Sequence, residues 1–103
     1  KFSCSKDTTN PGSAACRKCA ANLITVTMNP RGGARPMISD KTDTSGACAV
    51  RTFVCEGPTA NIEINGGDMG TVEDTGRVTF SVNCNSARTA WTACGNAITE
   101  LEC

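Results

Sequence analysis

The sequence predicts an all-β fold: a disulfide-stapled antiparallel β-sandwich of about seven short strands, immunoglobulin-like in architecture. Three observations point to this class. Runs of alternating apolar and polar residues recur along the chain, turn residues separate them, and eight cysteines are available to hold them together. Alternation with a period of two is typical of half-buried strands, because successive side chains of a strand point to opposite faces.

The run Cys48–Cys55 is the central element of this prediction. It is rich in β-branched and aromatic residues and has a cysteine at each end, which is the composition of a strand. An extended strand of this length holds its ends about 23 Å apart, whereas a disulfide needs Cα atoms within about 7 Å. Cys48 and Cys55 are therefore expected to bond to two other parts of the chain.

The other elements follow from the same alternation and from turn chemistry. Residues 1–15 are rich in Ser, Thr, Asn, Pro and Gly and predict an irregular extension, so that the sandwich domain spans 16–103. Turns are predicted at 56–58, 65–68, 73–76 and 95–96, and a long connection at 29–46. Between them, strands are predicted over 23–28, 60–64, 77–84, 89–94 and 97–103, with a short segment over 69–72.

Two predicted strands place particular side chains in the core. The inward face of 77–84 comprises Val78, Phe80, Val82 and Cys84. Trp91, the single tryptophan, is expected to fill the space between two sheets. By the same parity Cys103 points inward, and in an up-and-down succession of strands it ends near Cys84. A Cys84–Cys103 disulfide is the resulting prediction.

The cysteines are expected to supply much of the stability. Leu, Ile, Val and Phe together number only 16 of 103 residues, while each disulfide contributes on the order of 2–4 kcal/mol. So many cysteines in a small chain indicate an oxidising compartment. With no leader sequence and no apolar run long enough to cross a bilayer, the sequence is interpreted as a mature secreted, extracellular chain or an excised module of one. All eight cysteines are expected to be bonded: Cys4, Cys16, Cys19, Cys48, Cys55, Cys84, Cys94 and Cys103.

Charge and composition argue against several functions. Ten basic residues balance ten acidic ones, which disfavours a nucleic-acid partner and membrane insertion. Histidine is absent, which removes Ser-His, Cys-His and His-metal chemistry. A carboxylate pair for glycoside hydrolysis remains conceivable, but the candidates lie at predicted turns, where acids usually meet solvent. These candidates are Glu63, Asp68, Glu73 and Asp74.

Two metal motifs are also weak. Cys16-x-x-Cys19 has no second pair of closely spaced ligands for zinc, and structural disulfides are the simpler interpretation. Asp40, Asp43 and Ser45 precede Gly46 with a spacing that does not fit the alternate ligands of a calcium loop. No enzymatic activity, cofactor or metal is therefore expected.

An ordered set of motifs carries a family resemblance. These motifs are Cys16-x-x-Cys19, Asn22-Leu23-Ile24-Thr25, the Cys48–Cys55 run, Asn61-Ile62-Glu63-Ile64-Asn65 and Ala90-Trp91-Thr92. Together they resemble the nematode six-cysteine domain over roughly residues 16–103. The resemblance implies a secreted or surface protein, often part of a multidomain chain, and brings no catalytic residue with it.

The resemblance also separates the cysteines into two groups. Mapped residue by residue, the six cysteines of the family are Cys16, Cys19, Cys48, Cys55, Cys84 and Cys103. Cys4 and Cys94 lie outside that pattern, so we expect them to bond to each other, either within one chain or between neighbouring chains.

The function predicted from these features is that of an extracellular structural or interaction module without catalytic activity. Its partner would be another extracellular protein or a second copy, with self-assembly into a polymer or fibre as a variant, and O-glycans are possible at Thr8 and Thr9. The alternative is a secreted ligand or protease inhibitor that presents the 29–47 loop. Arg31 and Arg35 would then serve as bait for a trypsin-like pocket.

Overall fold

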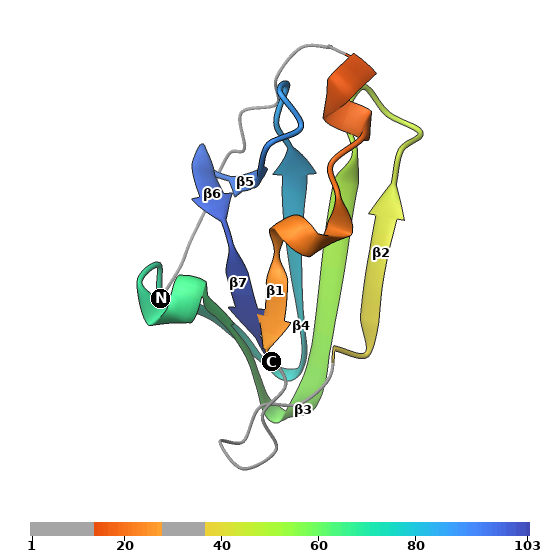
Figure 1. The fold of residues 1–103 in the computed structure, drawn as a ribbon. Coiled ribbons are helices and arrows are strands. Elements are labelled where there is room, and N and C mark those ends of the chain that lie inside the picture. The colour runs from red at the N-terminus through yellow and green to blue at the C-terminus, as the bar shows by residue number, and fades with distance from the viewer. Residues whose placement is uncertain (1–13, 28–36) are drawn as a thin grey trace.

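Strands dominate the computed structural model, which describes residues 14–27 and 37–103 (Figure 1). The predicted all-β class is confirmed, and the described helical segments are short 3-10 turns. In chain order the elements are η1 Ala14–Arg17, η2 Ala21–Leu23, β1 Thr25–Thr27, β2 Ser39–Asp43, β3 Val50–Ile64, η4 Asn65–Gly67, β4 Thr71–Cys84, β5 Trp91–Ala93, β6 Asn96–Ile98 and β7 Glu100–Glu102. None of the described helical segments is of the length and hydropathy that crossing a membrane requires.

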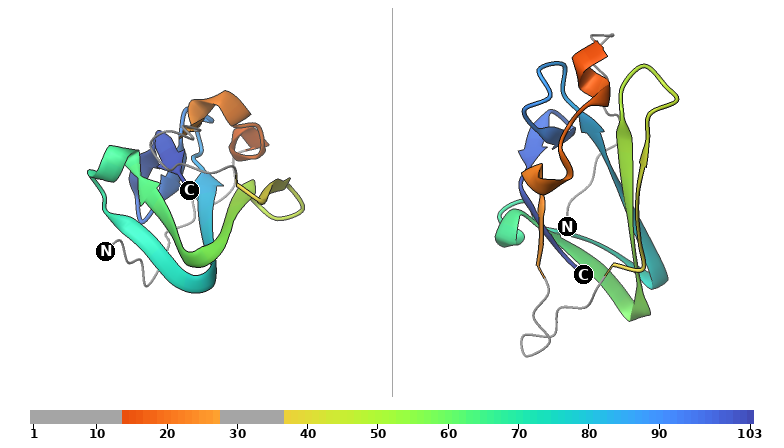
Figure 2. Two further views of the ribbon diagram at one scale, coloured as in Figure 1. Left: turned by 90° about the horizontal axis from the view of Figure 1, so that it is seen from below. Right: turned by 45° about the vertical axis from the view of Figure 1, so that its right-hand side comes forward.

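The strands form one curled sheet in place of the predicted two-sheet antiparallel sandwich. Its order is β1-β7-β3-β4-β5-β6, with β2 also paired to β3. The sheet is mixed, because β1 runs parallel to β7 while the other neighbours are antiparallel. Figure 2 shows β2 with the adjoining halves of β3 and β4 on one side, and β1 with β7 on the other. Two layers arise because one sheet folds over on itself.

The fold-over lies in the long β3–β4 ribbon, where two turns were predicted. The predictions of turns at 56–58 and 73–76 are wrong, since both strands continue through these residues. Gly57 lies opposite Gly76, and the register shifts between Gly57 and Ala60. Pro58 falls inside this irregularity, where the absence of a backbone N–H disrupts the hydrogen bonding between the strands least. The two sets of turn residues therefore combine into one bend of the ribbon.

Replacing Gly76 by alanine is expected to destabilise the protein by about 1–2 kcal/mol, because Gly76 has a φ of +85°. An added Cβ would meet no atom within 4 Å, so the cost comes from the backbone alone. Urea denaturation measures it. Gly46→Ala is the matched control, since its Cβ would come no closer than 3.9 Å to its nearest neighbour and Gly46 is not among the positive-φ glycines. Equal effects of the two substitutions would contradict the view that the positive φ of Gly76 makes glycine necessary at the bend.

Two other connections differ from expectation. The segment predicted as a long connection over 29–46 contains β2, which pairs along its whole length with β3, although residues 28–36 lie outside the described part of the chain. The hairpin turn between β5 and β6 falls at Cys94 and Gly95, one residue earlier than predicted. Both have positive φ, 52° and 79°, the combination that a two-residue hairpin turn favours. The predicted turn at 65–68 is confirmed as η4.

The core fills the inside of the curl. The predicted inward face of β4 is confirmed, and Trp91 is 1% exposed. The largest fully buried side chains are Trp91, Phe53, Ile62, Ile64, Ile98, Leu101, Val82, Cys16, Cys55 and Cys84. They come from β3, β4, β5, β6, β7 and η1, and they belong to a single hydrophobic cluster.

Candidate functional site

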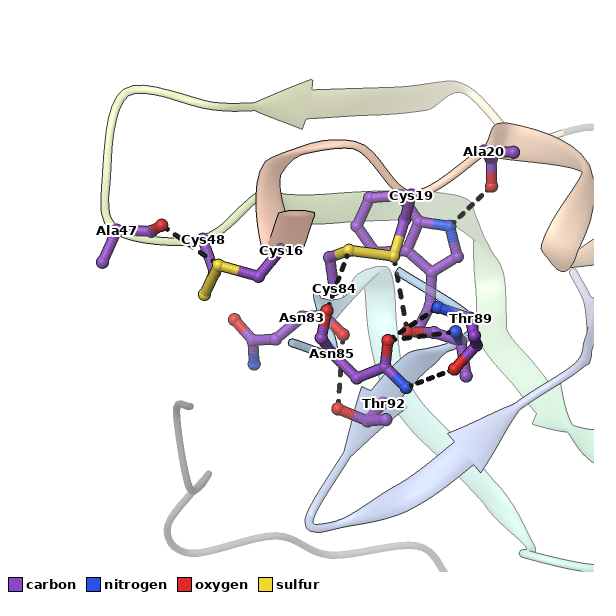
Figure 3. Close-up of a disulfide and its surroundings, with 12 residues drawn as sticks. Cys16, Cys19, Ala20, Ala47, Cys48, Asn83, Cys84, Asn85, Thr89 and Thr92 are labelled. Carbon is purple, nitrogen blue, oxygen red and sulfur yellow. Dashed lines mark hydrogen bonds between the residues drawn. A yellow bond between two sulfur atoms is a disulfide. The ribbon is translucent and has the colours of Figure 1, made fainter. Parts of the chain in front are cut away.

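Three disulfides join the terminal segments to the β3–β4 ribbon or to the residues just before it. Cys16 bonds Cys48, Cys19 bonds Cys84, and Cys55 bonds Cys103, with Cα–Cα distances of 4.8, 5.7 and 5.7 Å. Figure 3 shows the first two near each other. The prediction that Cys48 and Cys55 tie their strand to two different parts of the chain is confirmed.

The predicted Cys84–Cys103 disulfide is wrong. It assumed an up-and-down succession of strands, in which the last strand ends beside Cys84. In the structure β7 pairs with the far half of β3, at Glu63 and Ile64. The end of the chain therefore returns to Cys55, and Cys84 is left for the N-terminal segment at Cys19.

The remaining two cysteines are those outside the family pattern. Cys94 is disulfide-bonded, and no described cysteine is free. The predicted Cys4–Cys94 bridge involves Cys4, which lies outside the described residues, so that pairing stays a prediction.

A buried arginine forms the polar centre of the interior. Arg51 is 5% exposed, because it shares the inward face of β3 with Phe53 and Cys55. Its Nε and Nη2 donate to the two carboxylate oxygens of Asp40 at 2.7 Å each, and its Nη1 donates to the carbonyl of Ala21 at 2.9 Å. The guanidinium also lies over the ring of Phe53, 4.7 Å from the centroid.

Trp91 of β5 completes this cluster. The Arg51 guanidinium lies 5.7 Å from its ring, and its Nε1 donates to the carbonyl of Ala20 at 2.9 Å. The cluster thus joins β2, β3, β5 and the segment around η2. Since the guanidinium has only donors and this fork is occupied by fixed partners, we interpret the cluster as a structural clamp. Strand parity with Phe53 was the signal in the sequence that could have located Arg51.

Arg51→Lys is expected to lower the free energy of unfolding by about 2 kcal/mol, because lysine keeps the charge but loses the paired bonds and the stacking. Thermal or urea denaturation measures the effect. Arg77→Lys is the control, since the Arg77–Glu56 pair is exposed, with side chains 63% and 42% accessible, and should change stability by less than about 1 kcal/mol. Similar losses in both variants would contradict a special role for the buried fork.

The carboxylates considered for glycosidase chemistry do not gather in the interior. Glu63 and Glu73 lie on β3 and β4, at neighbouring positions of the outer face beyond the bend. Asp68 follows η4, and Asp74 accepts a hydrogen bond from the backbone N–H of Thr75. All four border solvent rather than a buried cleft, and Glu63, Glu73 and Asp74 fall within strands and not at turns.

The residues considered for calcium have other partners. Asp40 bonds Arg51, whereas one oxygen of Asp43 accepts from the backbone N–H and the hydroxyl of Ser45 at 2.8 and 2.7 Å. These bonds hold the pKa of Asp43 below its usual value. No cluster of metal-ligating side chains occurs among the described residues.

Asn65 fixes the η4 turn against the end of the chain, a role that the sequence did not reveal. Its Oδ1 accepts from the backbone N–H groups of Thr99 and Glu100 at 2.8 and 3.3 Å. Its Nδ2 donates to the carbonyl of Ala97 at 3.0 Å. Asn65 adopts a positive φ of 53°, which asparagine tolerates better than most residues. The turn therefore has a defined position beside β7.

Four predicted positions lie outside the described residues. These are Thr8 and Thr9, the possible O-glycan sites, and Arg31 and Arg35, the possible protease bait. The part of that loop that the structure describes includes β2, which is committed to pairing with β3.

Comparison with known proteins adds a family and one relative. The C6 domain family matches residues 19–103. An uncharacterized protein of Caenorhabditis elegans is 34% identical over an alignment of 103 positions, which covers 96% of this chain and 71% of the relative. No solved structure matches. None of these similarities assigns a catalytic residue.

Proposed function

The chain belongs to the C6 domain family, and from that membership and its disulfide framework we propose that it is an extracellular structural or interaction module without catalytic activity. The observation that carries this proposal is that the buried arginine and the disulfides hold the chain together. The buried Arg51 and the three disulfides each join separate segments of the chain. Interaction through the exposed sheet faces is then the activity that this architecture supports.

The three disulfides support the extracellular part of the proposal, because they need an oxidising location. Each of the three bridges joins residues at least 32 positions apart, so reduction would release long loops and cost the fold much of its stability. Expression through a secretory pathway should give folded protein in the medium with no thiol reactive after denaturation. Two or more reactive thiols, or equal stability of the reduced protein, would contradict the proposal.

Self-assembly is the finer form of the proposal. Cys94 lies half-buried in the hairpin turn between β5 and β6, and the Cys4 to which it would bond belongs either to its own chain or to a neighbour. Denaturing gel electrophoresis without reductant distinguishes the two. A ladder that collapses on reduction supports a covalent polymer, and a single monomer band leaves non-covalent association as the route.

The alternative function, that of a protease inhibitor, can be tested directly. Incubation with trypsin should leave the enzyme's activity unchanged if the chain is a structural module. Dose-dependent inhibition that is lost on replacing Arg31 and Arg35 by alanine would instead establish the inhibitor.

A further inference from the structure

The charges of this neutral chain are unevenly distributed over its surface. Among the described residues, two ion pairs occur, Arg51 with Asp40 and Arg77 with Glu56. The acids left without an ion pair lie mainly beyond the bend of the β3–β4 ribbon, whereas the cations left without one lie toward the other end of the molecule. These acids are Glu63, Asp68, Glu73, Asp74, Glu100 and Glu102, besides Asp43 on β2; the cations are Arg17, Lys18, Lys41 and Arg88.

Four glutamates form what we call the acidic face, on three adjacent strands. Glu73 lies on β4, Glu63 on β3, and Glu100 and Glu102 on β7. The register places them on the outer side, because the alternate residues Ile62, Ile64 and Leu101 are fully buried. No cation from the described residues pairs with any of the four.

Within the acidic face two glutamates oppose each other directly. Glu63 of β3 pairs in register with Glu102 of β7. Like charges at opposed positions of neighbouring strands are destabilising, so this arrangement costs the isolated chain some stability. A positively charged partner laid on the face would turn that cost into an attraction.

The η4 turn holds two of these carboxylates close together. A Cβ on Gly66 would come within 3.1 Å of Glu100 Oε1, and a Cβ on Gly67 within 3.7 Å of Glu63 Cδ. Glu100 therefore lies against Gly66, and Glu63 lies against the adjacent Gly67. Since Asn65 fixes this turn, the negative charges are held in a defined arrangement.

Three exposed cations form the basic end, composed of Arg17, Lys18 and Arg88. The Cys19–Cys84 disulfide brings their two segments together, because Cys19 directly follows Lys18 and Cys84 precedes the loop that carries Arg88. Figure 1 shows η1 and the β4–β5 connection at the same end of the molecule, with η4 and β7 lower in the view.

The basic end is also held in place. Arg17 Nε donates to the carbonyl of Ala47 at 3.2 Å. In the other loop Asn85 Oδ1 accepts from the backbone N–H of Thr89 at 2.8 Å, and the N–H of Arg88 donates to the carbonyl of Asn85 at 3.0 Å. Figure 3 shows this loop beside the Cys19–Cys84 bridge.

We propose that the acidic face is an interaction surface for a second copy of this chain, which docks its basic end there. Charge complementarity identifies the occupant: the same chain offers a fixed group of unpaired cations opposite in sign to a fixed group of unpaired glutamates. The contact is heterologous, because two different patches meet, and such contacts continue into rings or open filaments. The elongated shape, 40 × 26 × 24 Å, suits end-to-face stacking. This inference rests on the proposed function and names the non-covalent contact by which the module would self-assemble.

Sedimentation velocity at low and high ionic strength gives the first test. The wild-type protein should associate with rising concentration at about 20 mM salt, and association should weaken at least tenfold at about 500 mM salt, because screening shortens the range of these interactions. Persistence at high salt would overturn the electrostatic contact.

Two charge-reversal variants give the decisive test. The first, Glu63→Lys with Glu102→Lys, carries a face without net charge and a basic end, while the second, Arg17→Glu with Lys18→Glu, carries an acidic face and an acidic end. Each alone should remain monomeric, and an equimolar mixture should form a one-to-one complex, since the basic end of the first variant can dock on the acidic face of the second. A mixture that stays monomeric while the wild type associates overturns this inference and leaves the proposed function standing.

A neutral variant separates assembly from stability. Glu63→Gln with Glu102→Gln should melt at a higher temperature than the wild type, because the opposed charges are gone, and yet associate less. Unchanged association would exclude the acidic face as the contact. The wild type is also tested with a cationic peptide such as polylysine. If the protein is monomeric at every salt concentration but binds the peptide at the acidic face, the partner is not a second copy of the chain.

Discussion

Replacing Trp91 by alanine is expected to lower the free energy of unfolding by about 3–5 kcal/mol, the usual cost of removing a buried aromatic side chain. Trp91 is 1% exposed, and its Nε1 bonds the carbonyl of Ala20. Its ring also lies 5.7 Å from the Arg51 guanidinium. Urea denaturation of the wild type and the variant measures the loss.

Trp91→Phe separates packing from hydrogen bonding. Phenylalanine keeps an aromatic ring but removes the donor, so the carbonyl of Ala20 loses its partner at a cost of about 1–3 kcal/mol. The alanine variant should therefore be clearly less stable than the phenylalanine variant. An unchanged melting temperature in Trp91→Ala, with loss of a binding activity, would show that the residue serves recognition instead.

Alternation in the sequence was a good guide to which side chains are buried. The inward face of β4 and the burial of Trp91 were both predicted, because these depend on strand parity and not on the path of the sheet. The same parity places Arg51 in the interior beside Phe53, but charge normally indicates a surface position. The carboxylate of Asp40, on a strand that the sequence did not reveal, supplies the opposite charge that the buried guanidinium needs.

Turn residues were a poorer guide to topology. Gly57 and Gly76 both belong to stretches with the composition of turns, and a reading along the chain assigns each its own reversal. In the structure they face each other across one ladder, so a relation between residues 19 positions apart decides their role. The single curled sheet follows from that pairing, and local sequence carries no signal for it.

The disulfide connectivity could not be predicted for the same reason. Cys84 and Cys103 both point inward, as parity requires, but an inward direction does not specify a partner. The return of β7 to the far half of β3 decides that Cys103 meets Cys55. The acidic face has the same origin, because Glu63 and Glu102 become neighbours only through that strand pairing.

Removing the Cys19–Cys84 disulfide with a pair of alanine substitutions is expected to cost about 4 kcal/mol. The bridge joins residues 65 positions apart, and the loop-entropy estimate for such a separation is about 4 kcal/mol. Cys16 and Cys48 are 32 positions apart, for which the same estimate is only about 0.6 kcal/mol smaller. Denaturant unfolding of the two double variants compares the bridges.

The structure predicts that the Cys19–Cys84 bridge also stabilises the hydrogen bonds made by the residues that follow Cys19. Ala20 and Ala21 directly follow Cys19, and their carbonyls accept the hydrogen bonds of Trp91 and Arg51. Without the bridge this segment is free to move away from both donors. Trp91→Phe should then cost less in the variant that lacks Cys19 and Cys84 than in the wild type, since the bond it removes is already weakened.

The Cys55–Cys103 bridge provides the control background for this coupling. It joins β3 to the end of the chain, and neither of its cysteines adjoins Ala20 or Ala21 in the sequence. Trp91→Phe should therefore cost the same in a protein lacking Cys55 and Cys103 as in the wild type. Equal costs of Trp91→Phe in all three backgrounds would mean that the N-terminal segment holds its place against Trp91 without the Cys19–Cys84 bridge, and the bridge would then stabilise the protein through loop entropy alone.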